Sequence, residues 1–361
     1  MENPQYRPLS RDGFEIAIIC ALPRETNSVL CVMDEIWHDC RQYYGKNIGD
    51  DNSYDFGKIG VHCVVIVTLP DMGLVQASSA SRSLKMSFVS IKLALLVGVC
   101  GAVPFKRDGS EIILGDVIIS ETIVHLDHRR QYAGKFQRKN ALLDVHGRPN
   151  EEILGLLRRW KIPTILETLR QGSMCHLRHL LQRLDIVYPG TKRDTLFQSG
   201  YIHKHRGNCS ECSAAERDVC ESALTASCSD TLCDVTQLVP RHRLEATGSA
   251  NVTPEPIIHI GSIGTTNAVM KSAHHRDQHA ELEGIIAFEM EGAGVWDKFN
   301  CLVIKGVCDY ADSHKSKIWQ DYAAAVAAAV AKEALMHFVT ARGLPEPAIS
   351  NGKAPLNTSQ Y

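Results

Sequence analysis

The sequence predicts an α/β protein: a single domain with a central mixed, largely parallel twisted sheet flanked by helices, which carries a long helical and irregular insertion. Two observations support this prediction. Short apolar runs rich in Val and Ile alternate with helical stretches, a pattern typical of strands buried on both faces of a sheet. The pattern is interrupted between about residues 128 and 256, where Arg, His, Cys and Ser are frequent, and then resumes. We therefore expect one domain at 14–342, between flexible tails at 1–13 and 343–361.

The first half of the domain is expected to begin with the apolar strand FEIAIICAL, after which Pro23 suits the first turn of a helix. Gly73 provides a turn before a second, Ala/Ser-rich helix. The predicted elements are a strand at 14–22, a helix that includes Val29, Leu30 and Met33, a strand at 61–69, a helix that ends near Phe88, and a strand at 91–98.

The second half continues with a short strand and, after the insertion, returns to the same alternation. The insertion itself contains two helical pieces. The predicted elements are a strand at 116–120, helices at 151–160 and 176–184, strands at 257–260, 285–288 and 302–307, and an Ala-rich helix at 321–340.

Composition and charge exclude several classes of protein. Of the 361 residues, 44% are hydrophobic and 22% are charged, which is ordinary for a globular protein. A net charge of −2 and the lack of nucleic-acid-binding motifs predict no nucleic-acid partner. The polar N-terminus has no secretory signal, and the longest apolar run, 93–105, is too short to cross a membrane. We expect a cytoplasmic protein whose 13 cysteines are reduced.

Unusual residues follow four of the predicted strands. Because ligands bind at the carboxyl ends of the strands in open α/β sheets, these residues form a candidate site. They are Glu25, the small-residue turn at 98–102, the pair Glu289 and Glu291, and Asp309. Taken alone, each carboxylate would more often cap a helix or sit at its first turn. Together they indicate a binding site.

Six ordered blocks of the chain resemble the nucleoside phosphorylase/nucleosidase superfamily, in particular the branch of the purine nucleoside phosphorylases and methylthioadenosine nucleosidases. The blocks also resemble fungal proteins in which such a domain stands alone or precedes an immune-receptor-like region. They are IAIICALPRE, LLVGVCGAV, LGDVIIS, HIGSIGTTNAVMK, FEMEGAG and VIKGVCDYADSHK, and they lie within 14–125 and 257–340. The resemblance implies a phosphorylase-like domain at 14–342, no cofactor, and a homo-oligomer.

The resemblance also implies a reaction, the cleavage of the bond between ribose and purine through an oxocarbenium-like transition state. Asp309 occupies the position of the acid that protonates the base, and burial would help it to hold that proton. Glu25 corresponds to the residue that activates water. Glu291 would bind the ribose hydroxyls, with Met290 beneath the sugar and Glu289 as its supporting partner. The implied base-binding residues are Phe288, Val99, Cys100 and Gly101.

Two departures from the family pattern concern the nucleophile and the base. Phosphorylases have an arginine and a serine where this chain has Leu96 and Val99, which favours water over phosphate, although Arg24 or Arg82 could still hold phosphate. Val269 replaces a phenylalanine that stacks on the base. Phe288, or an aromatic residue of the insertion such as Tyr132 or Phe136, would have to replace it.

The 5′ side of the substrate is indicated only by a group of basic residues near the site blocks. They could receive a 5′-phosphate or triphosphate, or they could form a solvated helix face. These residues are Lys271, Arg276, Lys315 and Lys317, whereas Asp312 and His314 are interpreted as structural.

Cysteines in the insertion have a zinc-like spacing. Cys209 and Cys212 form a Cys-x2-Cys pair, with histidines upstream and a further cysteine downstream. A second such pair is missing. The other candidates are His203, His205, Cys220, Cys228 and Cys233. The spacing permits a structural zinc ion, but we predict no metal and favour reduced surface thiols.

The function predicted from the sequence is hydrolysis of the N-glycosidic bond of a purine nucleoside or nucleotide, of the adenosine or ATP type. The products would be the free base and ribose or ribose phosphate. Two alternatives remain: a phosphate-dependent purine nucleoside phosphorylase, and a non-catalytic nucleoside-sensing module of the same fold.

Overall fold

The structure is a computed structural model that describes residues 7–133, 135–139, 148–214, 219–246 and 253–339. The predicted C-terminal tail therefore lies outside the described residues, as do the first six residues of the predicted N-terminal tail. Within that N-terminal segment, the carbonyl of Pro8 accepts a hydrogen bond from the Tyr44 hydroxyl at 2.8 Å.

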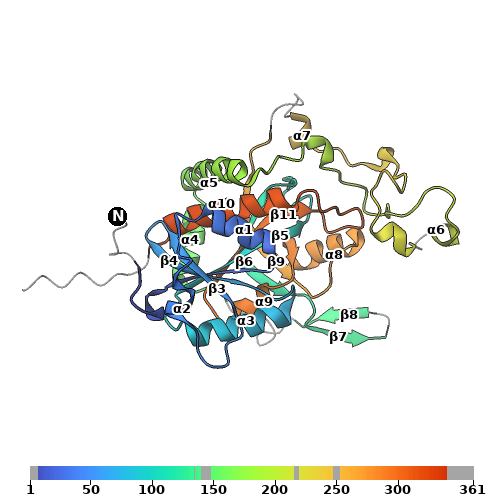
Figure 1. Cartoon of the computed structure of the whole chain (residues 1–361). Coiled ribbons are helices and arrows are strands. Elements are labelled where there is room, and N and C mark those ends of the chain that lie inside the picture. The colour runs from blue at the N-terminus through green and yellow to red at the C-terminus, as the bar shows by residue number, and fades with distance from the viewer. Residues whose placement is uncertain (1–6, 134, 140–147, 215–218, 247–252, 340–361) are drawn as a thin grey trace, which may run out of the picture.

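The core is a nine-stranded mixed sheet, which confirms the predicted fold class (Figure 1). Its strand order is β10-β9-β6-β11-β5-β1-β4-β3-β2. The strands are β1 (Ile16–Cys20), β2 (Glu35–Ile36), β3 (Tyr54–Ile59), β4 (His62–Thr68), β5 (Leu93–Ala102), β6 (Val117–His125), β9 (Ile258–Thr265), β10 (Ile285–Glu289) and β11 (Cys301–Asp309). A separate hairpin, β7 (Arg129–Tyr132) and β8 (Lys135–Arg138), projects from the body of the protein.

The sheet closes on itself at one end. Strand β10 pairs in parallel with β9 and also antiparallel with the end of β5, through Ala287 opposite Ala102 and Phe288 opposite Gly101. As a result, β5, β11, β6, β9 and β10 form a closed circuit, while β1, β4, β3 and β2 extend from it as an open sheet.

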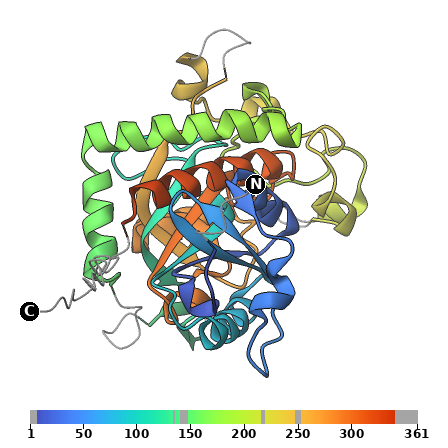
Figure 2. The same cartoon turned by 60° about the vertical axis from the view of Figure 1, so that its left-hand side comes forward.

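Helices cover both faces of the sheet. On one face lie α1 (Pro23–Val32) and α10 (Gln320–His337), and α5 (Pro163–Leu184) packs outside α10, as Figures 1 and 2 show. On the other face lie α3 (Leu74–Ser87) and α9 (Gly292–Trp296). The remaining helices are α2 (Cys40–Tyr44), α4 (Glu151–Trp160), α6 (Ser210–Ala214), α7 (His242–Ala246) and α8 (Ala273–Glu283).

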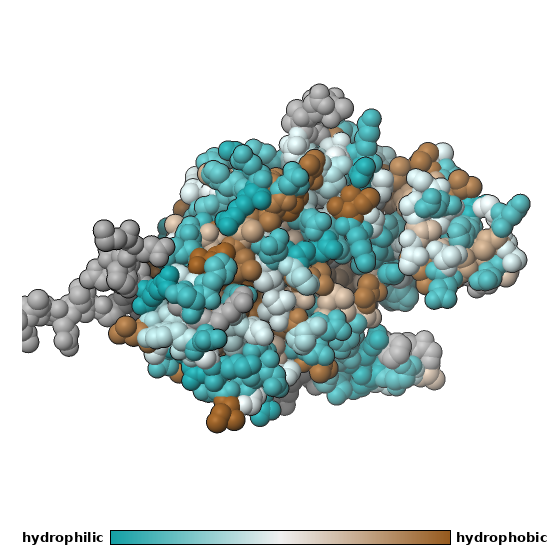
Figure 3. All heavy atoms as spheres, in the orientation of Figure 1, coloured by the Kyte–Doolittle hydropathy of each residue, from teal (hydrophilic) through white to brown (hydrophobic). Residues whose placement is uncertain are grey.

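The alanine-rich α10 lies unusually close to the sheet. Its small side chains and a glycine in the facing strand allow this approach, because a Cβ on Gly306 would lie only 2.0 Å from the carbonyl oxygen of Ala323. The hydrophobic core therefore continues from the strands through α10 to α5. Figure 3 shows hydrophobic side chains on one outer face of the protein only as separate small patches.

The predicted and observed elements differ mainly in length. Strands β5, β6 and β9 each continue four or five residues beyond their predicted ends, and α5 begins at Pro163 instead of His176. Strand β3 was not predicted because Asp55, Gly57 and Lys58 interrupt its apolar pattern. Helix α8 was not predicted because only Ala273 and Arg276 of its residues are buried, so its sequence has no apolar stripe.

The insertion is fastened to the domain at several points. Trp160 of α4 is fully buried and donates a hydrogen bond to His337 Nδ1 at 3.2 Å. Arg243 of α7 forms an ion pair with the buried Asp116, with Nη1 at 2.5 Å and Nη2 at 3.1 Å from its two oxygens. Within the described part of the chain, no helix combines the length and apolar composition that crossing a membrane requires.

Candidate active site

Two glycines of β5 make room for two acidic side chains. A Cβ on Gly98 would lie 2.2 Å from Glu25 Oε1, and a Cβ on Gly101 would lie 2.7 Å from Asp309 Oδ1. Both carboxylates therefore rest directly on the strand. The small-residue turn expected at 98–102 is instead the last part of strand β5, and this stretch forms the floor of the candidate site.

Glu25 lies in the first turn of α1, directly after β1. It is buried, and its carboxylate accepts three backbone hydrogen bonds: Oε2 from the N–H groups of Ala21 and Leu22, at 2.9 and 2.8 Å, and Oε1 from Val99 at 2.8 Å. Burial raises the pKa of Glu25, and this effect exceeds the opposite influence of the Lys305 ammonium. A buried carboxylate of raised pKa suits a general base.

Asp309 is the last residue of β11. The pairing register of this strand shifts between Val307 and Asp309, an irregularity of the kind that redirects a side chain near a functional site. Asp309 Oδ1 accepts a hydrogen bond from the N–H of Ala311 at 2.8 Å. Ala311 has φ of 52°, a left-handed conformation that costs energy in a residue other than glycine. The local backbone is thus strained around this carboxylate.

Lys315 lies beside Asp309, with Nζ 3.1 Å from Oδ2. Burial alone would lower the pKa of Lys315, but the Asp309 carboxylate together with Cys308 and Asp312 raises it. The sequence suggested a 5′-phosphate contact for Lys315, and the structure places its ammonium group against the predicted base-protonating residue.

Glu289 and Glu291 have different environments although they are two residues apart. Glu289 Oε2 accepts hydrogen bonds from the N–H groups of Glu291 and Gly292 at 2.9 and 2.8 Å, and the Thr265 hydroxyl donates to Oε1. Glu289 thus holds the start of α9. Burial raises its pKa to about 7. Glu289 therefore contacts the backbone of Glu291, the residue that it is predicted to support.

Glu291 faces a buried lysine that the sequence analysis missed. Lys305 of β11 is 1% exposed, and its Nζ lies 3.1 Å from Glu291 Oε2, while Glu291 Oε1 accepts a long hydrogen bond from Gly73 N–H at 3.3 Å. Burial would lower the pKa of Lys305, but the charges of Glu291, Glu25 and Glu289 raise it. A signal was available: Lys305 interrupts the otherwise apolar strand CLVIKGVC, where a charged residue has to be paired.

The predicted base-binding residues differ in how deeply their side chains are buried. Val99 is half-buried, Cys100 is buried, and Phe288 packs in a small cluster with Val103, Leu126, Ile285 and Ala311. Met290 is half-buried. Tyr132 is exposed on the hairpin, and the side chain of Phe136 lies outside the described residues.

The residues considered for phosphate binding are dispersed or engaged. Arg276 is 2% exposed and donates hydrogen bonds to the carbonyl of Tyr310 at 2.9 Å and to Asp277 at 2.7 Å. Arg24 forms an ion pair with Asp321 at 2.7 Å. Leu96 and Val269, which replace family residues, differ in burial: Leu96 is buried and Val269 is exposed. The remaining basic candidates, Lys271, Lys317 and Arg82, are exposed. The predicted zinc candidates Cys209 and Cys212 lie in the insertion, in a separate cluster with His205 and Cys220.

The fold is shared with solved structures of nucleosidases. A 5′-methylthioadenosine/S-adenosylhomocysteine nucleosidase of Helicobacter pylori with 5′-methylthioadenosine in its active site matches with a TM-score of 0.52 and 11% identity, over 90% of this chain and 99% of that chain. The Neisseria meningitidis nucleosidase in complex with methylthio-immucillin-A matches with a TM-score of 0.51 and 13% identity, over 91% and 100%. Futalosine hydrolase of Helicobacter pylori matches with a TM-score of 0.51 and 13% identity, over 90% and 98%.

These matches confirm the resemblance to the nucleoside phosphorylase/nucleosidase superfamily at the level of the fold. In sequence, the chain is similar to a nucleotide-binding leucine-rich repeat (NLR)-like protein of Hyaloscypha variabilis, with 30% identity over 333 residues. That match covers 90% of this chain but only 29% of the relative, so the chain spans less than a third of the length of the relative. No family model matches the chain.

Proposed function

We propose that this chain, whose fold is that of the nucleosidases, hydrolyses the N-glycosidic bond of a purine nucleoside or nucleotide. One observation carries the proposal: three buried acidic side chains come from three separate strand ends, Glu25 and Asp309 against glycines of β5 and Glu291 against Lys305 of the paired strand β11. Burying carboxylates is costly, and each of these three is held by backbone N–H groups or by a lysine.

In the proposed reaction, a water molecule attacks C1′ of the ribose while the bond between C1′ and N9 of the purine breaks. Glu25 accepts a proton from the water, and Asp309 delivers a proton to N7, so that the base leaves as a neutral molecule. The products are the free base and ribose, or ribose phosphate if the substrate is a nucleotide. Before the next turnover, Glu25 releases its proton to solvent, and the pair of Asp309 and Lys315 takes up a proton from solvent.

The pair of Asp309 and Lys315 supplies the proton at the base end. Lys315 Nζ lies 3.1 Å from Asp309 Oδ2 and is half-buried, so a proton of its ammonium group can pass to the Asp309 carboxylate across one short contact. A purine that binds with N7 toward Asp309 becomes the strongest nearby acceptor once the glycosidic bond stretches. The proton then moves through Asp309 to the base.

The pair of Glu291 and Lys305 holds the sugar. The Lys305 ammonium donates a hydrogen bond to Glu291 Oε2 and orients the carboxylate, whose oxygens can accept hydrogen bonds from the ribose hydroxyls. The same carboxylate lies close to the positive charge that develops on the ribose ring in the transition state. This placement favours the transition state over the bound substrate.

Water is favoured over phosphate as the nucleophile. Phosphate binding uses cationic or N–H-rich surroundings, and here Leu96 is buried in the core, Arg24 is engaged by Asp321, and Arg82 is exposed on α3. The Val99 N–H, which could serve an anion, is already bound to Glu25. Lys271 and Lys317, which are exposed, remain our candidates for a 5′-phosphate.

The test is product analysis. The purified chain is incubated with adenosine, inosine and ATP, with and without inorganic phosphate, and the products are identified by mass spectrometry. We expect free base and ribose or ribose triphosphate without added phosphate, and no turnover by the Glu25→Gln variant. The matched control, Glu167→Gln on the exterior of α5, should retain full activity. Turnover that requires phosphate and yields ribose 1-phosphate would instead assign the chain as a phosphorylase.

A second candidate function is supported by the sequence relative. The NLR-like protein is far longer than this chain, which is consistent with a nucleoside-sensing domain that binds without turnover. Calorimetric titration with purine nucleosides distinguishes the two candidates. A sensing domain would bind them, release no free base on prolonged incubation, and keep its affinity in Asp309→Asn.

A further inference from the structure

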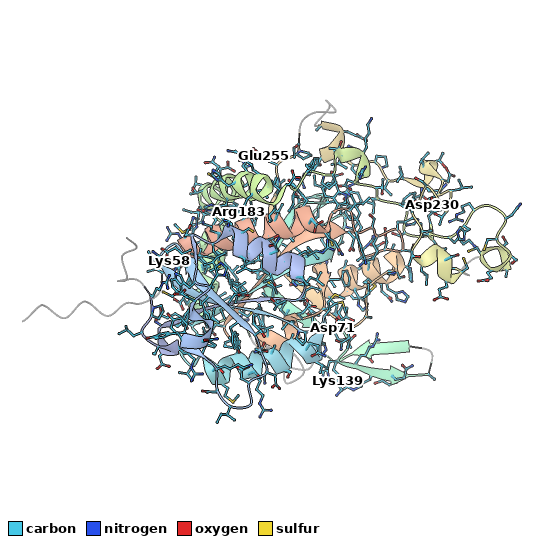
Figure 4. The ribbon with its side chains drawn as sticks, in the orientation of Figure 1. Lys58, Asp71, Lys139, Arg183, Asp230 and Glu255 are labelled. Carbon is cyan, nitrogen blue, oxygen red and sulfur yellow. The ribbon has the colours of Figure 1, made fainter. Side chains whose placement is uncertain are left out.

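We propose that the described parts of the cysteine-rich segment of the insertion, residues 203–214 and 219–233, form a zinc-binding module with two metal sites. Figure 1 shows this segment extending from the right-hand side of the protein, and Figure 4 labels Asp230 within it. Seven potential ligands form two separate groups. The first group is His205, Cys209, Cys212 and Cys220, and the second is His203, Cys228 and Cys233.

The first group has the composition and geometry of a complete structural zinc site. Its four ligand atoms all lie within 4.8 Å of one another, and His205 Nδ1 is 3.8 Å from Cys212 Sγ and 3.2 Å from Cys220 Sγ. A tetrahedral zinc ion with Zn–S of about 2.3 Å and Zn–N of about 2.0 Å places its ligand atoms about 3.5–3.8 Å apart. Three sulfurs and one imidazole nitrogen therefore already surround a point that such an ion fits.

The surroundings of the first group favour metal-bound thiolates over a disulfide. The structure records Cys209, Cys212 and Cys220 as free thiols, and the N–H of Cys220 points to Cys212 Sγ at 3.4 Å, a contact that stabilises a thiolate. Among the described residues, the apolar cluster at this place consists of these cysteines with Val219 and Ala223. Such a small cluster cannot hold a segment of this length in one conformation, whereas a zinc ion can.

The second group has a histidine oriented for metal binding. His203 Nε2 lies 3.1 Å from the carbonyl oxygen of Ala226, which can only accept, so this nitrogen carries the proton. His203 Nδ1 therefore presents its lone pair, and it lies 3.7 Å from Cys228 Sγ and 3.4 Å from Cys233 Sγ. A backbone carbonyl that fixes the other ring nitrogen is the usual arrangement around histidine ligands.

His314 packs beside the second group but does not belong to it, because its ring nitrogens are not within 4.8 Å of all three ligand atoms. It becomes a fourth ligand only if its side chain moves toward the ion. His314 is 9% exposed, and neither of its ring nitrogens has a hydrogen-bond partner in the part of the chain that the structure describes. Its ring centroid is 5.3 Å from that of His203, and it stacks on Phe197 at 4.0 Å. Buried ring nitrogens without partners are costly, and a metal ion on the His203 side would satisfy one of them.

This arrangement connects the second site to the candidate active site. His203 donates its backbone N–H to Ser313 Oγ at 3.0 Å, and Ser313 and His314 lie between Asp309 and Lys315 in the loop after β11. A metal ion that fixes His203 therefore also fixes the loop that carries Lys315. The inference does not depend on the proposed reaction, because metal binding can be measured without any substrate.

Zinc content is the first test. The chain is purified under reducing conditions without chelators, and its metals are measured by inductively coupled plasma mass spectrometry. We expect two zinc ions per chain, one in Cys212→Ser and in Cys228→Ser, and two in the control Cys175→Ser, whose thiol is exposed on α5. If a serine variant does not fold, Cys220→His, which retains a ligand, is expected to fold and to keep both ions.

Each other result decides against part or all of the proposal. Loss of a single zinc ion in Cys212→Ser, with none lost in Cys228→Ser, would refute the second site. Both sites would be refuted if the wild-type chain contained no zinc, or iron instead of zinc. They would also be refuted if mass spectrometry without a reductant showed that these cysteines form disulfides.

Hydrogen–deuterium exchange tests the connection to the loop. Chelation of the wild-type chain should increase exchange in peptides that cover 310–315, and Cys228→Ser should reproduce this increase without a chelator. Exchange in β3 and β4, at the other end of the sheet, serves as the control and should not change. Unchanged exchange at 310–315 would refute the connection.

Discussion

Two groups of buried charged side chains in this protein differ in how many of their hydrogen-bond donors and acceptors have a partner. The first, the anchor cluster, consists of Asp116, His259 and Arg243. Asp116 accepts from the N–H groups of Ile113 and Ile257 at 3.0 and 2.9 Å, from His259 at 2.8 Å, and twice from Arg243. Burial would raise the pKa of Asp116, but His259 and Arg243 outweigh burial and lower it.

The second group, the site cluster, consists of Glu25, Glu291, Lys305, Asp309 and Lys315. Lys305 Nζ carries three protons, but among the described residues it has one hydrogen-bond acceptor, Glu291 Oε2. In the part of the chain that the structure describes, Glu291 Oε1 has a single recorded contact, the long hydrogen bond from the Gly73 N–H. The difference indicates function: a saturated cluster holds the fold together, whereas an unsaturated buried cluster has capacity left for a ligand.

The largest expected effect is on catalysis, in the variant Asp309→Asn. The amide keeps the shape and the hydrogen bond from Ala311, but it cannot pass a proton to the base. We expect kcat to fall by about 10²–10⁴-fold, with little change in the thermal unfolding temperature. Steady-state kinetics and differential scanning calorimetry measure the two quantities. A large loss of stability with normal turnover would show that Asp309 belongs with the anchor residues.

The opposite pattern is expected for Asp116→Ala. Removing this carboxylate leaves Arg243, His259 and two N–H groups without their buried acceptor, which should lower the free energy of unfolding by about 3–5 kcal/mol. The folded fraction should retain its kcat. Urea denaturation gives the stability, and Asp51→Ala, at an exposed position, is the control. A drop in kcat without a loss of stability would reverse the assignment of the two clusters.

A smaller effect on catalysis is expected for Gly98→Ala. The new Cβ would lie 2.2 Å from Glu25 Oε1, so the carboxylate has to move away from the floor of β5. Misplacement by about 1 Å can cost about 10²-fold in rate. The control is Gly155→Ala on α4, where a Cβ meets nothing within 4 Å. Equal activity of the two variants would show that Glu25 does not need its present position.

The smallest expected effect concerns pH and Glu289. Its pKa is raised in the folded state from 4.5 to about 7, so its protonated form is favoured there. This contribution to stability is complete below pH 4.5 and is lost as the pH rises through about 7. Glu289→Gln should remove that dependence, whose slope is at most about 1.4 kcal/mol per pH unit. Parallel stability curves of wild type and variant, from urea unfolding across this range, would contradict the prediction.

The sequence predicts what depends on neighbours in the chain. Glu25 and Asp309 follow apolar strands directly, so their place at the carboxyl ends of the sheet could be expected without the structure. The anchor cluster could not be expected, because His259 and Arg243 lie more than 120 residues from Asp116. The strand that contains Lys305 was predicted, but which carboxylates its ammonium group meets depends on α1, β10 and β11 together.

The cysteine-rich segment is a second example of contacts that the sequence alone does not predict. The Cys-x2-Cys spacing is visible in the sequence, but the other members of each metal group are separated by irregular chain. Where no repeating pattern of hydrogen bonds fixes the path of the backbone, spacing alone does not say which side chains meet. The structure was needed to separate His203 from His205.

The closed circuit of strands has a consequence for self-association. The row of unpaired backbone groups at the edge of a sheet is a template for aggregation, and β10 removes one of the two edges of the main sheet by pairing with both β9 and β5. The other edge ends in β2, a strand of only two residues, where Glu35 and Lys58 form an ion pair. Strand addition to the main sheet is thus discouraged at both ends. Copies of this chain that assemble would therefore meet through their helical faces and loops.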